Sequence, residues 1–490
     1  MKTSLQFIVI LCLLMNIQFC PAQENGKEIV IGKTYSIHSE ILNEDRPYIV
    51  YTPDNYSEDK DPISVMYLLD GDGHFHHTSG IVSYLQDRRR IPNMMIVAIP
   101  NTGNRTRDLT PKIELDEETR NNMPSAGGAD NMLEFISSEL IPHINKNYNT
   151  NDYKLLVGHS LGGLFAVYTL LTKPELFDSY IAISPSMQWD KQNLYLKAQE
   201  FFNGEPELDA YFYMTMGNED GDRLGGAMKL AALFEENKSD QFGWDFKVMK
   251  EETHGTIPHR STYYGLEKIF KDWYQVDLSE LYAQEGMEGI ETYYAGISKK
   301  LGYEIEPYEE DLNNLGYQLL QSDQQERAIE IFDINVQRNP SSANVYDSRG
   351  EAYKEMGEKE KSIDDYLKSL KLNPGNQNAI DMLKSMDHQY DQDKLIKKMK
   401  PKELLKYVGN YRAKNSGNDI LLIIESVDGA LKAHAENILP LQELVPYGNN
   451  VFLAKEANLP MIFGVDKKNK VIKVSVQIGI IDTLTAVKDN

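Results

Sequence analysis

The chain has 490 residues, more than one hydrophobic core usually organises, so two to four domains are expected. Acidic residues number 74 against 51 lysines and arginines, and the net charge of −23 disfavours binding to nucleic acid or to an anionic membrane surface. The two cysteines, Cys12 and Cys20, belong to no cluster with zinc-site spacing, and the run of His74, His76 and His77 fits no common metal template. We therefore expect neither a metal nor a cofactor.

Residues 1–22 have the pattern of a secretory signal peptide. Lys2 supplies a positive start, residues 7–15 form a short apolar core, and small residues precede a cleavage site expected after Ala22. A lipoprotein anchored through Cys20 is the alternative, but the bulky Phe19 before it disfavours that. Both cysteines would be removed with this segment, so the domains would depend on core packing. The sequence therefore predicts export to the periplasm or the extracellular space, without stable insertion into a membrane.

Residues 23–277 alternate expected strands with expected helices, and most of the strands are continuous apolar runs. Such runs are typical of strands that helices cover on both faces, so we predict an α/β fold with a mostly parallel sheet. The expected strands are 48–52, 64–69, 94–99, 154–157, 180–183, 210–214 and 245–249. The expected helices include 130–147, 164–171, 223–236 and 262–274.

Residues 278–398 are predicted to be helical and to contain a repeat of 34 residues. Gly350 lies 34 positions after Gly316, and Pro374 lies 34 positions after Pro340. The pattern resembles two tetratricopeptide repeats, followed by a capping helix at 378–386, although each unit lacks its usual tryptophan. This predicts paired helices that stack on one another.

Residues 399–490 are rich in expected strands. The dipeptide Asp428-Gly429 separates two apolar runs and is a hairpin signal. Residues 471–478 alternate apolar with polar side chains, as a half-buried strand does. We expect a small antiparallel β domain here, with a partial barrel as one form.

The pentapeptide Gly158-His159-Ser160-Leu161-Gly162 has the form G-x-S-x-G. It follows an apolar run and precedes an expected helix, which is the context of a nucleophile elbow. The sharp turn would raise the Ser160 hydroxyl above the sheet and direct the N-terminus of the helix at it. We predict that Ser160 is a nucleophile; the alternative is an ordinary glycine-rich turn between strand and helix.

A serine nucleophile needs a base and an orienting carboxylate, and in proteins with this type of elbow they follow the serine in the order acid, then histidine. The acidic loop after the strand at 210–214 offers three carboxylates. Asp220 is the first choice, Glu219 is the alternative and Asp222 comes third, while the whole loop could instead be a solvated turn. His254, on a glycine-containing loop after the last strand, is the expected base, and His259 is its rival.

An oxyanion hole needs two backbone N–H donors. We assign these to Leu161, directly after the nucleophile, and to Asp72, in the loop after the strand at 64–69, with Gly73 as the alternative to Asp72. Two residues are candidates for substrate binding: Arg105 could contact an anionic group, and Trp189 could stack on an aromatic ring or a sugar. A core position is the other reading of Trp189.

Several motifs together resemble one esterase family of α/β-hydrolases, which includes enterochelin (ferric siderophore) esterases, feruloyl esterases and S-formylglutathione hydrolases. The resemblance covers about residues 28–275 and implies an α/β-hydrolase fold with a triad of Ser160, Asp220 and His254. The repeats resemble a tetratricopeptide tail on some exported bacterial hydrolases, and the last domain weakly resembles a β domain appended to some penicillin-recognising hydrolases. The motifs are Tyr67-Leu68-Leu69-Asp70-Gly71, Gly158-His159-Ser160-Leu161-Gly162-Gly163, Ser184-Pro185-Ser186, Gly217-Asn218-Glu219-Asp220 and His254-Gly255.

The sequence thus predicts an exported serine esterase that hydrolyses a siderophore ester, or a carbohydrate or feruloyl ester, through an acyl-enzyme on Ser160. Its expected partner is a small ester, and the helical repeats could bind a protein or a second copy. Two alternatives stay open. One is an acyltransferase with the same triad, and the other is a retired hydrolase scaffold that acts as a tetratricopeptide binding module.

Overall fold

The computed structural model describes residues 29–54, 56, 61–274, 276–391, 396–415, 418–436, 438–448, 450–466, 468–478 and 482–489. The predicted signal peptide lies outside these residues. Within them, no helix combines the length and the apolar composition that a membrane crossing requires. The domain boundaries expected from the sequence, at 22/23, 277/278 and 398/399, stay predictions.

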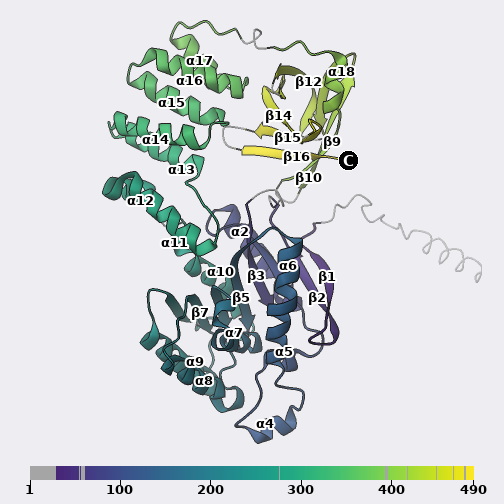
Figure 1. Ribbon diagram of the computed structural model, residues 1–490, viewed down its shortest axis with the longest axis vertical. Coiled ribbons are helices and arrows are strands. Elements are labelled where there is room, and N and C mark those ends of the chain that lie inside the picture. Colours follow the sequence, from purple (N-terminus) through teal and green to yellow (C-terminus); the bar gives the residue numbers. More distant parts are fainter. Residues whose placement is uncertain are drawn as a thin grey trace, which may run out of the picture. The chain divides into compact units, whose positions relative to one another are not determined.

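A sheet of eight strands organises the first part of the chain (Figure 1). The strands from β3 to β8 run parallel, whereas β1 and β2 join the edge beside β4 in antiparallel pairs. The sheet order is β1-β2-β4-β3-β5-β6-β7-β8. The predicted α/β fold, with the topology of an α/β-hydrolase, is confirmed. The strands are β1 (Lys33–Ser39), β2 (Glu44–Tyr51), β3 (Ile63–Leu69), β4 (Met94–Ile99), β5 (Thr150–His159), β6 (Ser179–Ile183), β7 (Ala210–Met216) and β8 (Phe242–Val248).

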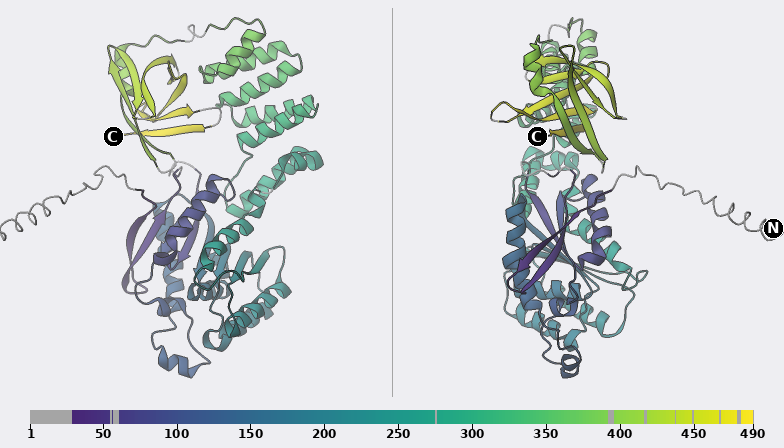
Figure 2. Two further views of the ribbon diagram at one scale, coloured as in Figure 1. Left: turned by 180° about the vertical axis from the view of Figure 1, so that it is seen from behind. Right: turned by 90° about the vertical axis from the view of Figure 1, so that its right-hand side faces the viewer.

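Helices cover both faces of this sheet (Figure 2). Alternate residues of the central strand enter different cores: Tyr67 belongs to the core that includes residues of α5 to α9, whereas Met66 and Leu68 belong to the core that includes residues of α2 and α10. Burial on both faces explains why the strands read as continuous apolar runs. The helices are α2 (Gly71–Asp87), α3 (Arg105–Leu109), α4 (Glu117–Asn122), α5 (Ala129–Glu134), a π-helical turn (Phe135–Leu140), α6 (Ile141–Asn147), α7 (Leu161–Thr172), α8 (Asn193–Asn203), α9 (Gly221–Asn237), α10 (Ile257–Ile269) and α11 (Lys271–Tyr274).

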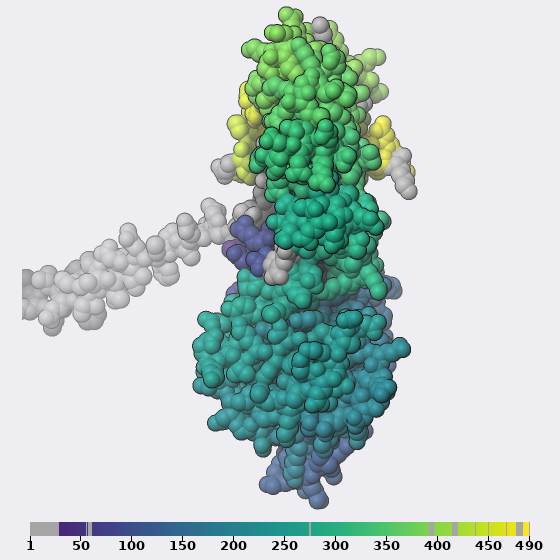
Figure 3. Space-filling view, turned by 90° about the vertical axis from the view of Figure 1, so that its left-hand side faces the viewer, coloured from purple at the N-terminus to yellow at the C-terminus, as the bar shows by residue number. Residues whose placement is uncertain are grey.

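Six helices follow, and from α13 onward each packs against the next along the chain (Figure 1). Figure 3 shows the surface of this helical part in teal to green. The pairs α13/α14 and α15/α16 carry the 34-residue spacing. A Cβ on Gly316 would lie 2.6 Å from the ring of Phe332, so glycine permits the close approach of the first pair. The assignment to the tetratricopeptide family stays a prediction. The helices are α12 (Leu278–Leu301), α13 (Glu309–Gln321), α14 (Gln325–Arg338), α15 (Ala343–Glu355), α16 (Lys359–Leu372) and α17 (Gln377–Ser385).

After the short helix α18 (Pro401–Leu404), eight antiparallel strands close into a barrel. The predicted hairpin is present at Asp428 and Gly429, which both have positive φ. The expected β domain is therefore confirmed, and it is a closed barrel because β16 pairs with β9. The strands are β9 (Gly409–Asn415), β10 (Asn418–Val427), β11 (Ala430–Ala435), β12 (Leu439–Gly448), β13 (Val451–Ala454), β14 (Leu459–Val465), β15 (Val471–Ile478) and β16 (Asp482–Lys488).

Aromatic rings fill the interior of this barrel. The Tyr407 ring packs edge to face against Phe452 and Phe463, with centroids 4.7 and 4.8 Å apart, and Tyr411 packs 5.9 Å from Phe463. All four residues are buried. The interior of the barrel is thus a packed core.

Phe463 and Ile462 are neighbours on β14 that face opposite sides of the barrel wall, so they form a matched pair. Phe463 is 3% exposed and Ile462 is 40% exposed. We predict that Phe463→Ala destabilises the barrel by about 3–5 kcal/mol, whereas Ile462→Ala changes its stability by less than about 1 kcal/mol. Urea unfolding followed by near-ultraviolet circular dichroism would measure both. Equal losses for the two variants would contradict the aromatic core.

Candidate functional site

The strand β5 ends in a turn too tight for most side chains. Ser160 has φ 59° and ψ −111°, a strained conformation for a residue with a Cβ. A Cβ on Gly158 would lie 2.2 Å from the carbonyl oxygen of Gly162, so glycine is required there. The expected elbow between strand and helix is therefore present, with Ser160 at the carboxyl edge of the sheet.

Hydrogen bonds from neighbouring segments hold Ser160 in this conformation. Its N–H donates to the carbonyl of Ile183 at 2.9 Å, and its own carbonyl accepts from the N–H groups of Ser186 and Leu164 at 3.0 Å. The apolar residues of α7 are buried behind the turn. Packing and backbone hydrogen bonds thus offset the strain of the turn.

The Ser160 hydroxyl lies 3.3 Å from the Ser186 hydroxyl. Ser186 is 4% exposed and belongs to the segment after β6, the strand beside β5. Sequence reasoning gave Ser186 no role, although Ser184-Pro185-Ser186 belongs to the motifs of the family resemblance. Ser186 follows β6, the strand beside β5, and this position was the sequence signal that could have placed it near Ser160.

His254 lies on the loop between β8 and α10, as expected. Its Nδ1 lies 3.1 Å from Oε2 of Glu219. Its ring centroid is 4.6 Å from that of His159, the residue before Ser160. The imidazole is therefore at the elbow, although among the described residues Ser160 Oγ bonds to Ser186 and not to His254.

The carboxylate beside His254 belongs to Glu219 and not to Asp220, so the first choice made from the sequence is replaced by its alternative. The Glu219 side chain is 8% exposed and contacts the imidazole. Asp220 is exposed as the N-cap residue of α9, and within the described ranges no hydrogen bond joins it to His254. The physical reason is a tight turn, in which the Glu219 N–H donates to the carbonyl of Gly217 at 2.8 Å.

The surroundings of Glu219 favour its ionised form. Burial by itself would raise the pKa of the Glu219 carboxyl, but hydrogen bonds to the carboxylate outweigh burial and lower that pKa. The donors are Ser184, Arg223 and His254. Glu219 is thus a carboxylate suited to orient an imidazole and to stabilise its charged form.

Two helices begin at this edge of the sheet, and their first N–H groups have no acceptor within the helix. Leu161 opens α7 and Asp72 is the second residue of α2, so both proposed oxyanion donors lie in first turns. The Gly73 N–H instead donates to the carbonyl of Asp70 at 2.9 Å. This bond disfavours Gly73 as the alternative donor.

A partly buried ion pair joins the start of α2 to the elbow. Arg105 donates to both carboxylate oxygens of Asp70, at 2.5 and 2.8 Å, and to the carbonyl of His159 at 3.2 Å. The hydrogen bond to Asp70 raises the pKa of Arg105. In the structure Arg105 braces the two first turns against each other through Asp70 and His159, and the expectation that it binds substrate stays a prediction.

Four further imidazoles continue in a row from His254. The ring of His74 lies 5.4 Å from His159 and 5.3 Å from His77, and His77 lies 5.6 Å from His259. His259, the rival base, is thus at the other end of the row. Burial lowers the pKa of both His159 and His77 to about 4, so these rings are neutral at neutral pH. Within the described ranges, no group of histidines and carboxylates could hold a metal ion.

A polar cavity of about 620 Å³ opens beside Glu219. Trp189 does not line it; the indole N–H donates to the carbonyl of Pro111 at 3.3 Å, and the ring packs on the apolar core. This contact favours the core reading of Trp189 over stacking on a substrate. The residues that line the cavity are Asp116, Gln188, Lys191, Asn218, Glu219, Asp220, Asp222 and Arg223.

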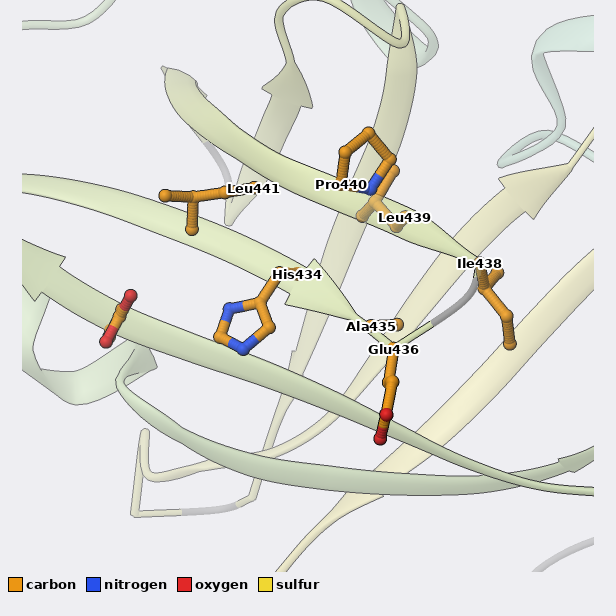
Figure 4. Close-up of a pocket in the computed structure, with 8 residues that line it drawn as sticks. His434, Ala435, Glu436, Ile438, Leu439, Pro440 and Leu441 are labelled. Carbon is orange, nitrogen blue, oxygen red and sulfur yellow. The ribbon is translucent and has the colours of Figure 1, made fainter.

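A cavity of about 580 Å³ lies on the barrel, between β10, β11 and β12 (Figure 4). Its wall is largely apolar, with Glu425, His434 and Glu436 as the polar side chains. It shares no residue with the site at Ser160. It therefore takes no part in the arrangement described above.

Residues 39–267 match the family model described as "Putative esterase". Ferri-bacillibactin esterase BesA of Bacillus subtilis is 36% identical over 152 residues, which cover 28% of this chain and 52% of BesA. A siderophore enterobactin esterase of Emericella nidulans is 32% identical over 157 residues, which cover 29% of this chain and 52% of that protein. The chain thus spans about half the length of these curated relatives.

One solved structure supports the same assignment. An IroE-like serine hydrolase from Shewanella oneidensis is 27% identical, with a TM-score of 0.53, and the match covers 62% of this chain and 98% of that chain. The fold, the elbow at Ser160 and the family match therefore agree, and residues 39–267 of this chain are similar to the putative esterase family of α/β-hydrolases.

Proposed function

We propose that the chain is a serine hydrolase that cleaves carboxylic esters, with Ser160 as nucleophile, His254 as base and Glu219 as the orienting acid. The observation that carries the proposal is the strained Ser160 at the elbow where the imidazole of His254 contacts the Glu219 carboxylate. A hydrolase scaffold without catalytic activity would not require a buried glutamate in contact with an imidazole at the elbow.

Ser160 first turns its hydroxyl from Ser186 toward Nε2 of His254. The imidazole takes the hydroxyl proton while Oγ attacks the ester carbonyl carbon, and Glu219 stabilises the imidazolium through Nδ1–H. Collapse of the tetrahedral intermediate expels the alcohol, which receives the proton from His254. Water then attacks the acyl-enzyme with the same base, and the carboxylic acid leaves.

The negative oxygen of the tetrahedral intermediate needs donors that are already in place. The N–H groups of Asp72 and Leu161 begin α2 and α7, whose dipoles add positive potential at the same edge. The ion pair between Arg105 and Asp70 holds the two helix starts at a fixed separation. These contacts support the assignment of both N–H groups to the oxyanion hole.

For the substrate we propose a polar ester, with a siderophore ester as the first class and a carbohydrate or feruloyl ester as the second. One curated relative is named as a ferri-bacillibactin esterase and another as a siderophore enterobactin esterase, which supports the first class. The cavity beside Glu219 is lined by charged and amide side chains, which favour a hydrogen-bonding substrate. With the predicted signal peptide, the proposal includes export to the periplasm or the extracellular space.

Ser160→Ala should reduce hydrolysis of p-nitrophenyl acetate by about 10³-fold or more, because the nucleophile is lost. A fluorophosphonate probe should label the wild-type protein, and peptide mass spectrometry should place the adduct on Ser160. Ser186→Ala is the matched control, since it removes the neighbouring hydroxyl and should leave the adduct in place. Retained activity in Ser160→Ala, or an adduct on another residue, would contradict the mechanism.

Glu219→Gln should lower kcat/KM by about 10²–10⁴-fold, because the amide can neither stabilise the imidazolium nor fix the ring tautomer by charge. Asp220→Asn changes the adjacent carboxyl in the same way and should stay within about threefold of wild type, a surface-charge effect. Steady-state kinetics at pH 8 would compare them. A larger loss in Asp220→Asn than in Glu219→Gln would restore the first choice made from the sequence.

The polar cavity also predicts selectivity among acyl groups. Esters with short or polar acyl groups should have kcat/KM values at least about tenfold above that of a palmitoyl ester, because a long alkyl chain finds no apolar wall among the residues that line the cavity. A series of p-nitrophenyl esters from acetate to palmitate would test this. A preference that rises steadily with chain length would rule out the polar cavity as the acyl site.

A further inference from the structure

Arg223 occupies an unfavourable position for a cation. It is the third residue of α9, in the first helical turn, where the helix dipole disfavours positive charge. Its side chain is 32% exposed and turns back toward the catalytic loop, where Nη1 lies 3.0 Å from Oε2 of Glu219. The same Nη1 lies 3.1 Å from Nδ1 of His254. The guanidinium therefore contacts both the acid and the base of the proposed triad.

These three atoms form a triangle, because Nδ1 of His254 also lies 3.1 Å from Oε2 of Glu219. A guanidinium has donors and no acceptor, so it cannot receive the Nδ1–H of the imidazole. When Nδ1 carries its proton, Arg223 and His254 must both donate to the same oxygen of Glu219. When His254 becomes an imidazolium, a second positive charge then stands in contact with Arg223.

In the part of the chain that the structure describes, the other ionisable groups near His254 are one carboxylate and two imidazoles. Glu219 attracts the imidazolium, and the ring of His159 lies 4.6 Å from that of His254, with His74 next to His159 at 5.4 Å. Because burial lowers the pKa of His159 to about 4, that ring adds no positive charge at neutral pH. Among the described residues, Arg223 is the one cationic side chain with a hydrogen bond or ion pair to His254 or Glu219.

We propose that Arg223 is a positioning residue that extends the activity of the site toward lower pH, by opposing the positive charge that would block His254 as a base. Glu219 alone would favour the imidazolium and would confine the free base to higher pH. The neighbouring guanidinium disfavours the same imidazolium by like-charge repulsion, so the neutral ring persists as the solution becomes more acidic. The inference deepens the proposed function and rests on it.

The pH dependence of kcat/KM for p-nitrophenyl acetate, measured from pH 4 to 9, tests the proposal. The acid limb is the low-pH side of this profile, where kcat/KM falls below its plateau. In Arg223→Gln the acid limb should move to higher pH by about one unit or more, so that kcat/KM at a given pH on this limb falls roughly tenfold. Arg223→Lys keeps a positive charge at this place and should restore an acid limb close to that of wild type. Circular dichroism should show that each variant retains the fold.

Arg260→Gln is the matched control. Arg260 lies on α10, is about half exposed, and pairs with Glu251 and Glu252. Its substitution makes the same change in net charge without touching His254, so the acid limb should stay within about 0.3 unit of wild type. A shift in Arg223→Gln alone would support the contact with the base as the cause.

A titration of His254 by nuclear magnetic resonance provides a readout that does not depend on hydrolysis. The titration midpoint of its imidazole should rise in Arg223→Gln, whether or not the protein cleaves the test ester. Failure of the proposed function can therefore be told apart from failure of the inference about Arg223. Should that variant not fold, Arg223→Met removes the same charge with a similar stem. An unchanged or lowered midpoint would overturn the proposal, as would a uniform loss of activity with no shift of the acid limb.

Discussion

The close approach of two glycines is the constraint on which the site depends. The backbone at Gly158 passes so near the carbonyl of Gly162 that a Cβ would be 2.2 Å from that oxygen, so only glycine permits the tight turn in which Ser160 has its strained conformation. The parallel sheet fixes one side of the turn and the buried helix α7 fixes the other. Every later step of the account, from the nucleophile to the oxyanion donors, depends on where this turn holds the serine.

Two arginines tie the loops around this turn together, and they do so by different means. Arg105 joins Asp70 to the backbone of His159 in a partly buried pair, which ties the two helix starts together. Arg223 instead lies against Glu219 and His254, where its charge acts on the ionisation of the base. One guanidinium is thus structural, whereas the other bears on the chemistry.

Local signals predicted the elbow, the base and the order of the α/β elements, because glycine spacing and continuous apolar runs are properties of adjacent residues. Side-chain direction within a tight loop is not such a property, so Asp220 was preferred although the turn at Gly217 directs Glu219 inward. The pairing of Arg105 with Asp70 spans 35 residues and has no sequence signal. Closure of the barrel likewise depends on a contact between Val487 and Arg412, far apart in the chain.

The central claim is that Ser160, His254 and two helix starts converge on one reacting carbon. A crystal structure of the protein after reaction with a fluorophosphonate would test it most directly, since the phosphoryl oxygen stands where the oxyanion forms. The account predicts that this oxygen lies about 2.7–3.1 Å from the N–H groups of Asp72 and Leu161, with the imidazole of His254 beside the Ser160 oxygen. An oxygen that faces away from both helix starts, or an imidazole out of reach of Ser160, would contradict it.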